Sequence, residues 1–212
     1  MLNAVLGMPL GDLLTFVLAG LVLNLTPGAD VIFAVSCGAA GGARAGAAAG
    51  LGVGLGGLWH VAWAAVGVAA LIVAHPSALW ALQILGAGYL LWLGWGFWRA
   101  VPISACSTAR RVPTPLWALW QGFAINALNP KVAVFILAFL PQFTDAARGP
   151  VGAQIMGLGA IFALSGAVVT AGYGMGAARF GAGLELAPTL RFWLRRGVAL
   201  VFVVLALRLL WA

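Results

Sequence analysis

Two prolines that lie inside strongly apolar sequence constrain this chain more than any other feature. Pro27 is in residues 24–30 (NLTPGAD) and Pro130 is in residues 126–132 (NALNPKV). Proline removes a backbone donor and breaks a helix. A broken helix at bilayer depth exposes backbone groups that lipid cannot satisfy, so such a segment has to be covered by protein or by a wet cavity. Interruptions at matching places in two halves of a chain predict a central binding site.

The composition predicts an all-α integral membrane protein. Of the 212 residues, 64% are hydrophobic and 7% are charged, and the mean hydropathy is +1.09. Such a chain has too little polar surface to cover a soluble globule. The net charge of +7 does not indicate nucleic-acid binding, because the arginines lie in short stretches between apolar runs and not on a basic face with interleaved aromatics.

The two cysteines, Cys37 and Cys106, do not have the spacing of a CxxC or zinc motif. We therefore expect neither a metal site nor a redox pair, and no motif indicates a cofactor. Ordinary packing or loop positions are the prediction for both.

Six apolar stretches have roughly the 20 residues that a helix needs to cross a bilayer. The first, 10–40, is too long for one straight crossing, which fits an interruption at Pro27. The other five are 47–74, 78–98, 116–140, 151–178 and 192–211. We therefore predict six transmembrane helices, of which the first and the fourth are broken near Pro27 and Pro130.

Arginine placement predicts the orientation in the membrane. If six helices cross, the loops on one side hold most of the arginines: Arg44, Arg99, Arg110, Arg111, Arg179, Arg191, Arg195 and Arg196. The other side holds Arg148 and Arg208. The positive-inside rule places the arginine-rich loops in the cytoplasm and both termini outside. A five-span alternative, with one segment lying at the interface, would move one terminus to the other side.

The sequence predicts a single membrane domain, 1–212, built from two inverted repeats. Residues 1–100 hold the first three predicted spans, 101–115 form a central cytoplasmic loop with three prolines, and 116–212 hold the other three spans. Because three is an odd number of crossings, the second unit is inserted upside down relative to the first. Repeats of this kind bring broken helices together near the membrane midplane, and rocking of one half against the other gives alternating access.

The residue types at the first break predict a polar site. Thr26 can cap a half-helix that begins at Pro27, whose missing N–H costs nothing at a first helical position. Gly28 has no side chain, so a ligand or a second backbone can approach closely. Asp30 falls in the first turn, where its charge suits the helix dipole, but a carboxylate in apolar sequence needs a cation, a proton or hydrogen-bond donors. Unwound carbonyl groups around Asn24 would add acceptors.

The second break has the same design with the opposite charge. Asn129 can cap a half-helix opened by Pro130, and Lys131 then lies in the first turn, where the helix dipole disfavours a cation. A nearby anion would remove this conflict, and two candidates exist: Asp30, or the carboxylate of a bound substrate. The free N–H groups at both half-helix starts would help to hold a carboxylate.

A purely structural alternative stays open at the level of sequence. Asp30 and Lys131 can form a permanent ion pair that locks two kinked helices, while Asn24 and Asn126 satisfy carbonyl groups that the breaks leave free. The functional interpretation is favoured because ionisable residues within a membrane are costly and generally functional, and here two of opposite sign coincide with the two breaks.

A row of glycines runs from the first loop into the second predicted span. Positions 38, 42, 46, 50, 54 and 57 have small-xxx-small spacing, which allows helix backbones to approach closely. Helix packing within the chain is the favoured interpretation of this glycine ridge. The alternative is a subunit interface, which would make the protein a homo-oligomer.

Several segments together resemble the LysE/RhtB family of amino-acid exporters. They are residues 24–30, Arg44 with the glycine-rich second span, residues 85–94 (LGAGYLLWLG) with Arg99, GFAIN at 122–126, NPK at 129–131 and PQF at 141–143. The resemblance covers about residues 10–210. The family usually has Pro-Gly-Pro at the first break, whereas this chain has alanine after Gly28.

The resemblance implies a secondary active transporter and not an enzyme. It would export an amino acid from the bacterial cytoplasm across the inner membrane, driven by the proton gradient or the membrane potential. The family's substrates include basic amino acids, homoserine, threonine, leucine and cysteine-related compounds. Because Asp30 is the one carboxylate that the sequence places at membrane depth, we expect a neutral substrate, with a basic one as the alternative.

The predicted mechanism is antiport against protons. The carboxylate of the substrate would face Pro130 and Lys131, and its ammonium group would face Asp30 and the carbonyls near Asn24 and Thr26. Protonation of Asp30 from outside would then favour release.

Two other classes of function compete with transport. A non-transporting assembly protein would use the glycine ridge to dimerise. A membrane thiol-electron conduit would need cysteines in the first and fourth spans, and the fourth predicted span contains none.

Overall fold

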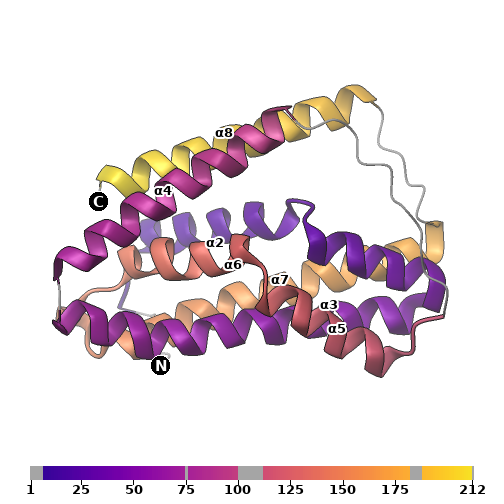
Figure 1. Ribbon diagram of the computed structural model, residues 1–212, viewed down its shortest axis with the longest axis horizontal. Helices are drawn as coiled ribbons and strands as arrows, with labels where there is room; N and C mark the ends of the chain where they lie inside the picture. The colour runs from indigo at the N-terminus through magenta and orange to yellow at the C-terminus, as the bar shows by residue number, and fades with distance from the viewer. Residues whose placement is uncertain (1–6, 75, 100–111, 182–187, 212) are drawn as a thin grey trace.

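The computed structural model describes residues 7–74, 76–99, 112–181 and 188–211, and the regular elements in these ranges are helical. The long helices lie side by side, and α4 and α8 form a pair along one edge (Figure 1). The elements are α2 (Leu10–Leu25), α3 (Ala29–Ala74), α4 (Pro76–Arg99), α5 (Pro115–Ala127), α6 (Pro130–Val134), the π-helix η1 (Phe135–Phe139), the 3-10 helices η2 (Leu140–Phe143) and η3 (Ala146–Arg148), α7 (Val151–Phe180) and α8 (Pro188–Trp211).

Length and hydropathy identify the candidate membrane spans among the described residues. Ala29–Gly67 and Val151–Phe180 are each long and apolar enough, and the pair Pro115–Ala127 and Pro130–Phe143 qualifies as one span bent by 53°. α2 is a shorter apolar helix. The described residues are therefore all-helical and consistent with a membrane protein, as predicted, and the count of six spans stays a prediction. Most of the predicted central loop, 101–111, lies outside the described residues.

A turn at Gly42 divides α3 into two limbs, 29–41 and 43–74. Gly42 has φ 79° and ψ 178°, a conformation that residues with a Cβ rarely adopt. The chain reverses direction here, at the right-hand end of Figure 1. A Cβ built on Gly38 or on Gly46, one on each limb, would meet the backbone of the same residue, Gly174 of α7. Gly174 of α7 therefore packs against both limbs of α3.

The second limb of α3 runs antiparallel to α7 with the two backbones close together. Gly46 lies against Gly174, Gly50 lies against Ala171, and further along the limb Gly159 lies against Val61. At Gly50 an added Cβ would meet the backbone of Ala171. Small residues permit this close approach, and the tight packing that results holds helices together in lipid.

On its other side α3 packs against α5. Gly52 faces the backbone of Leu119, and Gly122 of α5 faces the backbone of Ala49. The glycine ridge is therefore used within the chain, which confirms the interpretation as internal packing. An assembly protein that dimerises through the ridge loses its support.

The helices α4 and α8 pack antiparallel to each other. Gly94 approaches the carbonyl oxygen of Ala199, and toward the other end of the pair Gly86 approaches the side chain of Leu209. α4 also contacts η1, so the pair is joined to the rest of the bundle through the continuation of the second broken helix.

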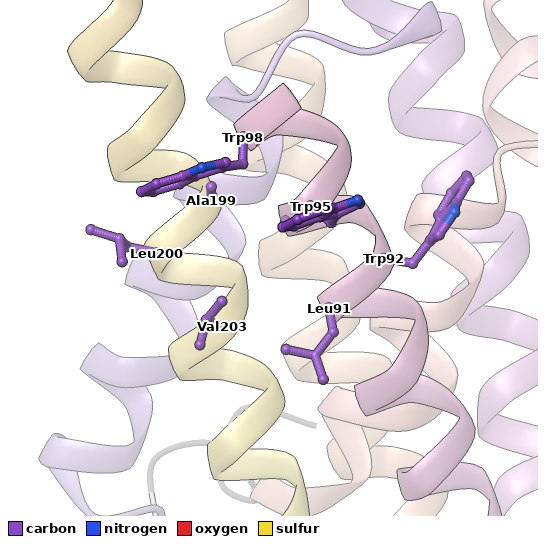
Figure 2. A pocket seen from close by; sticks show the side chains of 8 residues that line it. Leu91, Trp92, Trp95, Trp98, Ala199, Leu200 and Val203 are labelled. Carbon is purple, nitrogen blue, oxygen red and sulfur yellow. The ribbon is translucent and has the colours of Figure 1, made fainter. Parts of the chain in front are cut away.

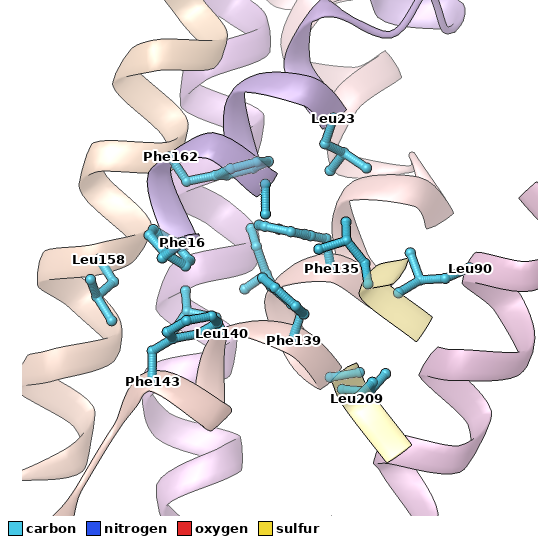
Figure 3. Close-up of a cluster of buried hydrophobic side chains, with 14 of the residues drawn as sticks. Phe16, Leu23, Leu90, Phe135, Phe139, Leu140, Phe143, Leu158, Phe162 and Leu209 are labelled. Carbon is cyan, nitrogen blue, oxygen red and sulfur yellow. The ribbon is translucent and has the colours of Figure 1, made fainter. Parts of the chain in front are cut away.

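Phenylalanine side chains fill the centre of the bundle, where α2, η1, η2 and α7 meet (Figure 3). Phe135 stacks on Phe139 and on Phe162, with ring centroids 4.9 and 4.8 Å apart. Phe16 meets Phe143 edge-on at 5.4 Å. Aromatic pairs in such geometries add to the gain from burial. This core fixes the chain that follows the second break against the helix that precedes the first.

The two ends of the bundle differ in charge. Four described arginines lie near helix ends that point to the right in Figure 1: Arg44 after the Gly42 turn, Arg99 at the end of α4, Arg179 at the end of α7 and Arg196 near the start of α8. At the opposite end Arg148 pairs with Asp145 at 3.7 Å, and Arg208 pairs with Asp12 at 3.3 Å. Described carboxylates thus offset positive charge at one end only.

Candidate functional site

The first break lies between α2 and α3, close to where the sequence predicts it. Thr26 takes an extended conformation and ends α2, and α3 begins at Ala29. The prediction that Thr26 caps the helix after Pro27 is wrong. Its hydroxyl instead donates to the carbonyl of Val22 at 2.6 Å, the back-bond across four residues that threonine makes readily in helices. The second half-helix therefore begins two residues later than predicted.

The second break has the local geometry that the sequence predicts. The side chain of Asn129 accepts a hydrogen bond from the backbone N–H of Lys131 at 3.0 Å, and Pro130 is the first residue of α6. The backbone N–H of Asn129 donates to the carbonyl of Asn126 at 2.9 Å. The cap and the proline therefore begin a new helix at the point where the chain bends.

Lys131 extends from the second break to the first. Its Nζ donates to the carbonyl oxygens of Leu23 and Thr26, both at 3.2 Å, and the side chain is buried with 6% exposure. These carbonyls belong to the C-terminal end of α2, which leaves acceptors without helical partners and carries partial negative charge. The end of α2 therefore supplies the negative environment that Lys131 needs. The predicted partners are carboxylates, of Asp30 or of a substrate, and not these carbonyls.

Asp30 is the buried carboxylate of the site, with 5% exposure. Its Oδ1 accepts the backbone N–H of Val31 at 3.0 Å. A Cβ built on Gly28 would lie 2.8 Å from this oxygen and 3.2 Å from Nζ of Lys131, so the two charged groups flank the glycine. They form no direct ion pair within 4.0 Å, and the described ion pairs lie elsewhere. A lock made by direct contact between Asp30 and Lys131, the simplest form of the structural alternative, is therefore not formed in this structure.

The carbonyl group of Leu25, the last residue of α2, also has a hydrogen-bond partner. Besides Val22 and Leu23, whose partners are given above, Leu25 accepts a hydrogen bond from the hydroxyl of Tyr173 on α7 at 3.1 Å. Three of the last four carbonyls of α2 thus have partners. Tyr173 is not among the predicted site residues, although a tyrosine within an apolar helix is a signal, because a hydroxyl at membrane depth requires an acceptor.

The two asparagines of the predicted site form no hydrogen bond with the described side chains of Asp30 and Lys131. Asn24 donates from Nδ2 to the carbonyl of Phe162 at 3.2 Å and to the hydroxyl of Ser165 at 3.1 Å, so it ties α2 to α7. Asn126 is buried, and its Oδ1 has no hydrogen-bond partner among the described residues. Its backbone carbonyl lies 2.9 Å from Nε2 of His60. Asn126 therefore keeps an unused acceptor.

A cavity of about 630 Å³ adjoins the first break. Leu25 and Val31 border it on either side of the break. Its other walls are Val35 of α3, Val168, Val169, Gly172, Tyr173, Gly176, Ala177 and Phe180 of α7, and Gly181. These walls are almost wholly apolar, and neither Asp30 nor Lys131 borders the cavity.

Metal-binding clusters do not occur in the described ranges, where no group of three or more His, Cys, Asp or Glu side chains is placed to hold an ion. Cys37 is buried among the alanines of α3 and α5. Cys106 lies outside the described residues.

Comparison with known proteins assigns the family. The model of the LysE type translocator family matches residues 21–212, nearly the whole chain and both breaks. The chain belongs to this family. The resemblance drawn from the sequence motifs is thereby confirmed, and the architecture described above is that of a LysE type translocator.

Relatives of this translocator include several efflux proteins. It is 31% identical to a homoserine/homoserine lactone efflux protein of Salmonella typhimurium over 80% of this chain and 82% of that protein. It is 31% identical to a leucine efflux protein of an Enterobacter species over 67% and 68% of the two chains. An uncharacterized membrane protein of Vibrio cholerae is 32% identical over 79% of this chain and 82% of that one. No solved structure gives a significant match.

Proposed function

We propose that this LysE type translocator exports a neutral amino acid by alternating access, with basic amino acids as the alternative substrate class. The support from relatives is the efflux of homoserine and of leucine by two proteins that are each 31% identical. The structural observation that carries the proposal is the buried pair of opposite charges, Asp30 and Lys131, on either side of Gly28 at the open end of α2. An amino acid zwitterion has the complementary two charges.

The arrangement suggests how a zwitterion would bind. The ammonium group of Lys131 donates hydrogen bonds to the carbonyls of Leu23 and Thr26. An incoming carboxylate would draw Lys131 toward itself, and the substrate's own ammonium group would take over these carbonyls beside Asp30. One ammonium replaces another, so the site keeps its charge balance through the exchange. Gly28 provides the space, because any side chain there would meet both charged groups.

The cavity beside the first break favours a neutral substrate. The side chains of its walls are apolar except for the hydroxyl of Tyr173, which donates to the carbonyl of Leu25. The three described carboxylates are Asp12, Asp30 and Asp145, and only Asp30 is buried. A substrate with a second positive charge would lack a second carboxylate among them, and burying an unpaired charge is costly.

We also propose two inverted repeats as the basis of alternating access. In such a scheme each span has a counterpart in the other half, and a two-fold axis in the membrane plane makes counterparts antiparallel. The pairing of the second limb of α3 with α7, and of α4 with α8, follows this pattern. The two breaks then occupy equivalent positions, and Lys131 connects them. Rocking of one repeat against the other would open the site to each side in turn.

The charge difference between the two ends supports a location in the bacterial inner membrane, with the arginine-rich end in the cytoplasm. At that end the described arginines Arg44, Arg99, Arg179 and Arg196 have no described carboxylate partner. The two arginines at the opposite end are paired with aspartates. Export would then run from the arginine-rich end to the aspartate-paired end.

The test is counterflow by the purified protein in liposomes. Leucine, homoserine and lysine are compared as trapped substrates, and we expect leucine and homoserine to exchange while lysine exchanges weakly. Each is then tested for uphill efflux with an imposed proton gradient. Exchange by none of the three would contradict the proposed function.

Asp30→Asn separates coupling from binding. We expect this variant to retain counterflow, because the amide still accepts a hydrogen bond from an ammonium group, and to lose uphill transport, because it cannot take up a proton. Asp145→Asn, at an exposed position, is the matched control and should behave as the wild type. Uphill transport by Asp30→Asn would show that this carboxylate does not couple transport to protons.

A further inference from the structure

A groove between α4 and α8 is not used by the site described above (Figure 2). It encloses about 580 Å³ and lies on the edge of the bundle that this helix pair forms. In Figure 2 the rings of Trp95 and Trp98 extend from α4 toward α8. The lining residues are Leu91, Trp92, Gly94, Trp95 and Trp98 of α4 and Ala199, Leu200 and Val203 of α8. The walls are apolar, and the three tryptophans remain largely exposed.

Two arginines lie at the end of this groove. The guanidinium of Arg99 is 4.4 Å from the ring centre of Trp95, and that of Arg196 is 4.5 Å from the ring centre of Trp98. Arg196 is also 4.2 Å from the ring centre of Phe192. Neither arginine is in an ion pair with a described carboxylate. A guanidinium that stacks on a ring keeps its N–H edge free for an oxygen anion.

The groove therefore changes from charged to apolar along its length. Trp98 and Ala199 lie toward the arginine end. Leu91 lies about two helical turns from Trp98, roughly 10 Å along α4, and Val203 lies about one turn from Ala199, roughly 6 Å along α8. Because this is the end that the proposed orientation places in the cytoplasm, the change runs from the membrane surface toward the hydrocarbon interior. Tryptophan is also the residue expected at that depth.

We propose that this groove is a binding site for an anionic phospholipid of the cytoplasmic leaflet. The phosphate would lie between the guanidinium groups of Arg99 and Arg196, and an acyl chain would run along the groove toward Leu91 and Val203. Two positive charges without a described carboxylate partner favour a headgroup with net negative charge over a zwitterionic one. The lipid would bridge α4 and α8, the helix pair that contacts the second broken helix through η1.

The test compares lipid retention by native mass spectrometry. Purified protein is equilibrated with an equimolar mixture of phosphatidylglycerol and phosphatidylcholine in detergent. We expect the wild type to retain phosphatidylglycerol preferentially and Arg99→Gln/Arg196→Gln to lose about tenfold of that preference. The matched control is Arg44→Gln/Arg179→Gln, which removes the same charge from exposed positions at the same end and should change the preference less than about twofold.

Equal losses in the two double variants would overturn the site, because they would mean attraction to the whole basic end. No preference by the wild type would overturn it too. Val203→Trp adds an independent arm, since it fills the groove and leaves both arginines in place. Retention should fall in this variant at an unchanged thermal midpoint, and undiminished retention would show that the groove does not hold the acyl chain. Counterflow is not measured in these arms, so their outcome is independent of the export proposal.

Discussion

Each of the two helix breaks contains a proline, but the backbone groups at the two breaks find their hydrogen-bond partners in different ways. At the second break the backbone turn is closed within a few residues, through the cap that Asn129 makes and its bond to Asn126. At the first break the carbonyls of Leu23, Leu25 and Thr26 take their donors from distant parts of the chain, namely Lys131 of α6 and Tyr173 of α7. The second break is therefore set by its own sequence, whereas the first depends on how the bundle assembles.

This difference suggests a division of roles. A break that is capped locally keeps its shape when surrounding helices move. A break that is closed by side chains from other elements opens when those side chains leave. The backbone N–H of Lys131 takes part in the local cap of the second break, whereas its ammonium group closes the first break from another element.

Replacement of Lys131 by methionine should have the largest effect on this comparison. The carbonyls of Leu23 and Thr26 would lose their donor in a buried place, which costs about 1–3 kcal/mol for each unsatisfied group. We expect the free energy of unfolding in detergent to fall by about 2–6 kcal/mol. We also expect a raised half-saturation concentration for any retained transport. Wild-type stability in this variant would show that the first break does not need Lys131.

Asn129→Ala should lower the free energy of unfolding by an intermediate amount. Thr114→Ala should lower it by a similar amount. Thr114 and Asn129 both cap a helix that begins with proline, and each substitution by alanine should cost about 1 kcal/mol. Only Asn129→Ala should change counterflow, because its cap sets the bend at the site and the cap at Thr114 lies at the start of α5. Equal loss of counterflow in both variants would remove the special role of the second break.

Phenylalanine at Tyr173 should have the smallest effect. It removes one hydrogen bond, to the carbonyl of Leu25, and should cost about 0.5 kcal/mol because this bond is exposed. Tyr89→Phe is the control, since its hydroxyl has no hydrogen bond to a described residue, and its stability should not change. Thermal midpoints of the two variants give the comparison, and identical midpoints would mean that the Tyr173 hydroxyl does not stabilise the end of α2.

Much of the helical layout could be predicted from the sequence, because apolar runs and prolines act locally. The predicted span 78–98 corresponds to α4 (Pro76–Arg99), and 151–178 corresponds to α7 (Val151–Phe180). Asn129 caps its helix as the pattern of asparagine before proline predicts.

The parts that could not be predicted depend on backbone groups and on distant neighbours. The partners of Lys131 are carbonyl oxygens, which every residue carries, so no residue type in the sequence marks them. Gly42 stands in a row of similarly spaced glycines, and tertiary packing decides which of them turns the chain. Thr26 has both the N-cap and the back-bonded option open to it, and only the structure separates them.

The Gly42 turn has a consequence for motion. Because only Gly42 separates the two limbs of α3, both limbs contact Gly174 of α7. Contact with one limb would oppose the sliding of α7 along the other, so the proposed rocking of one repeat against the other would have to pivot at Gly174. The distance between labels on α4 and α8, one in each proposed repeat, would report such a rotation.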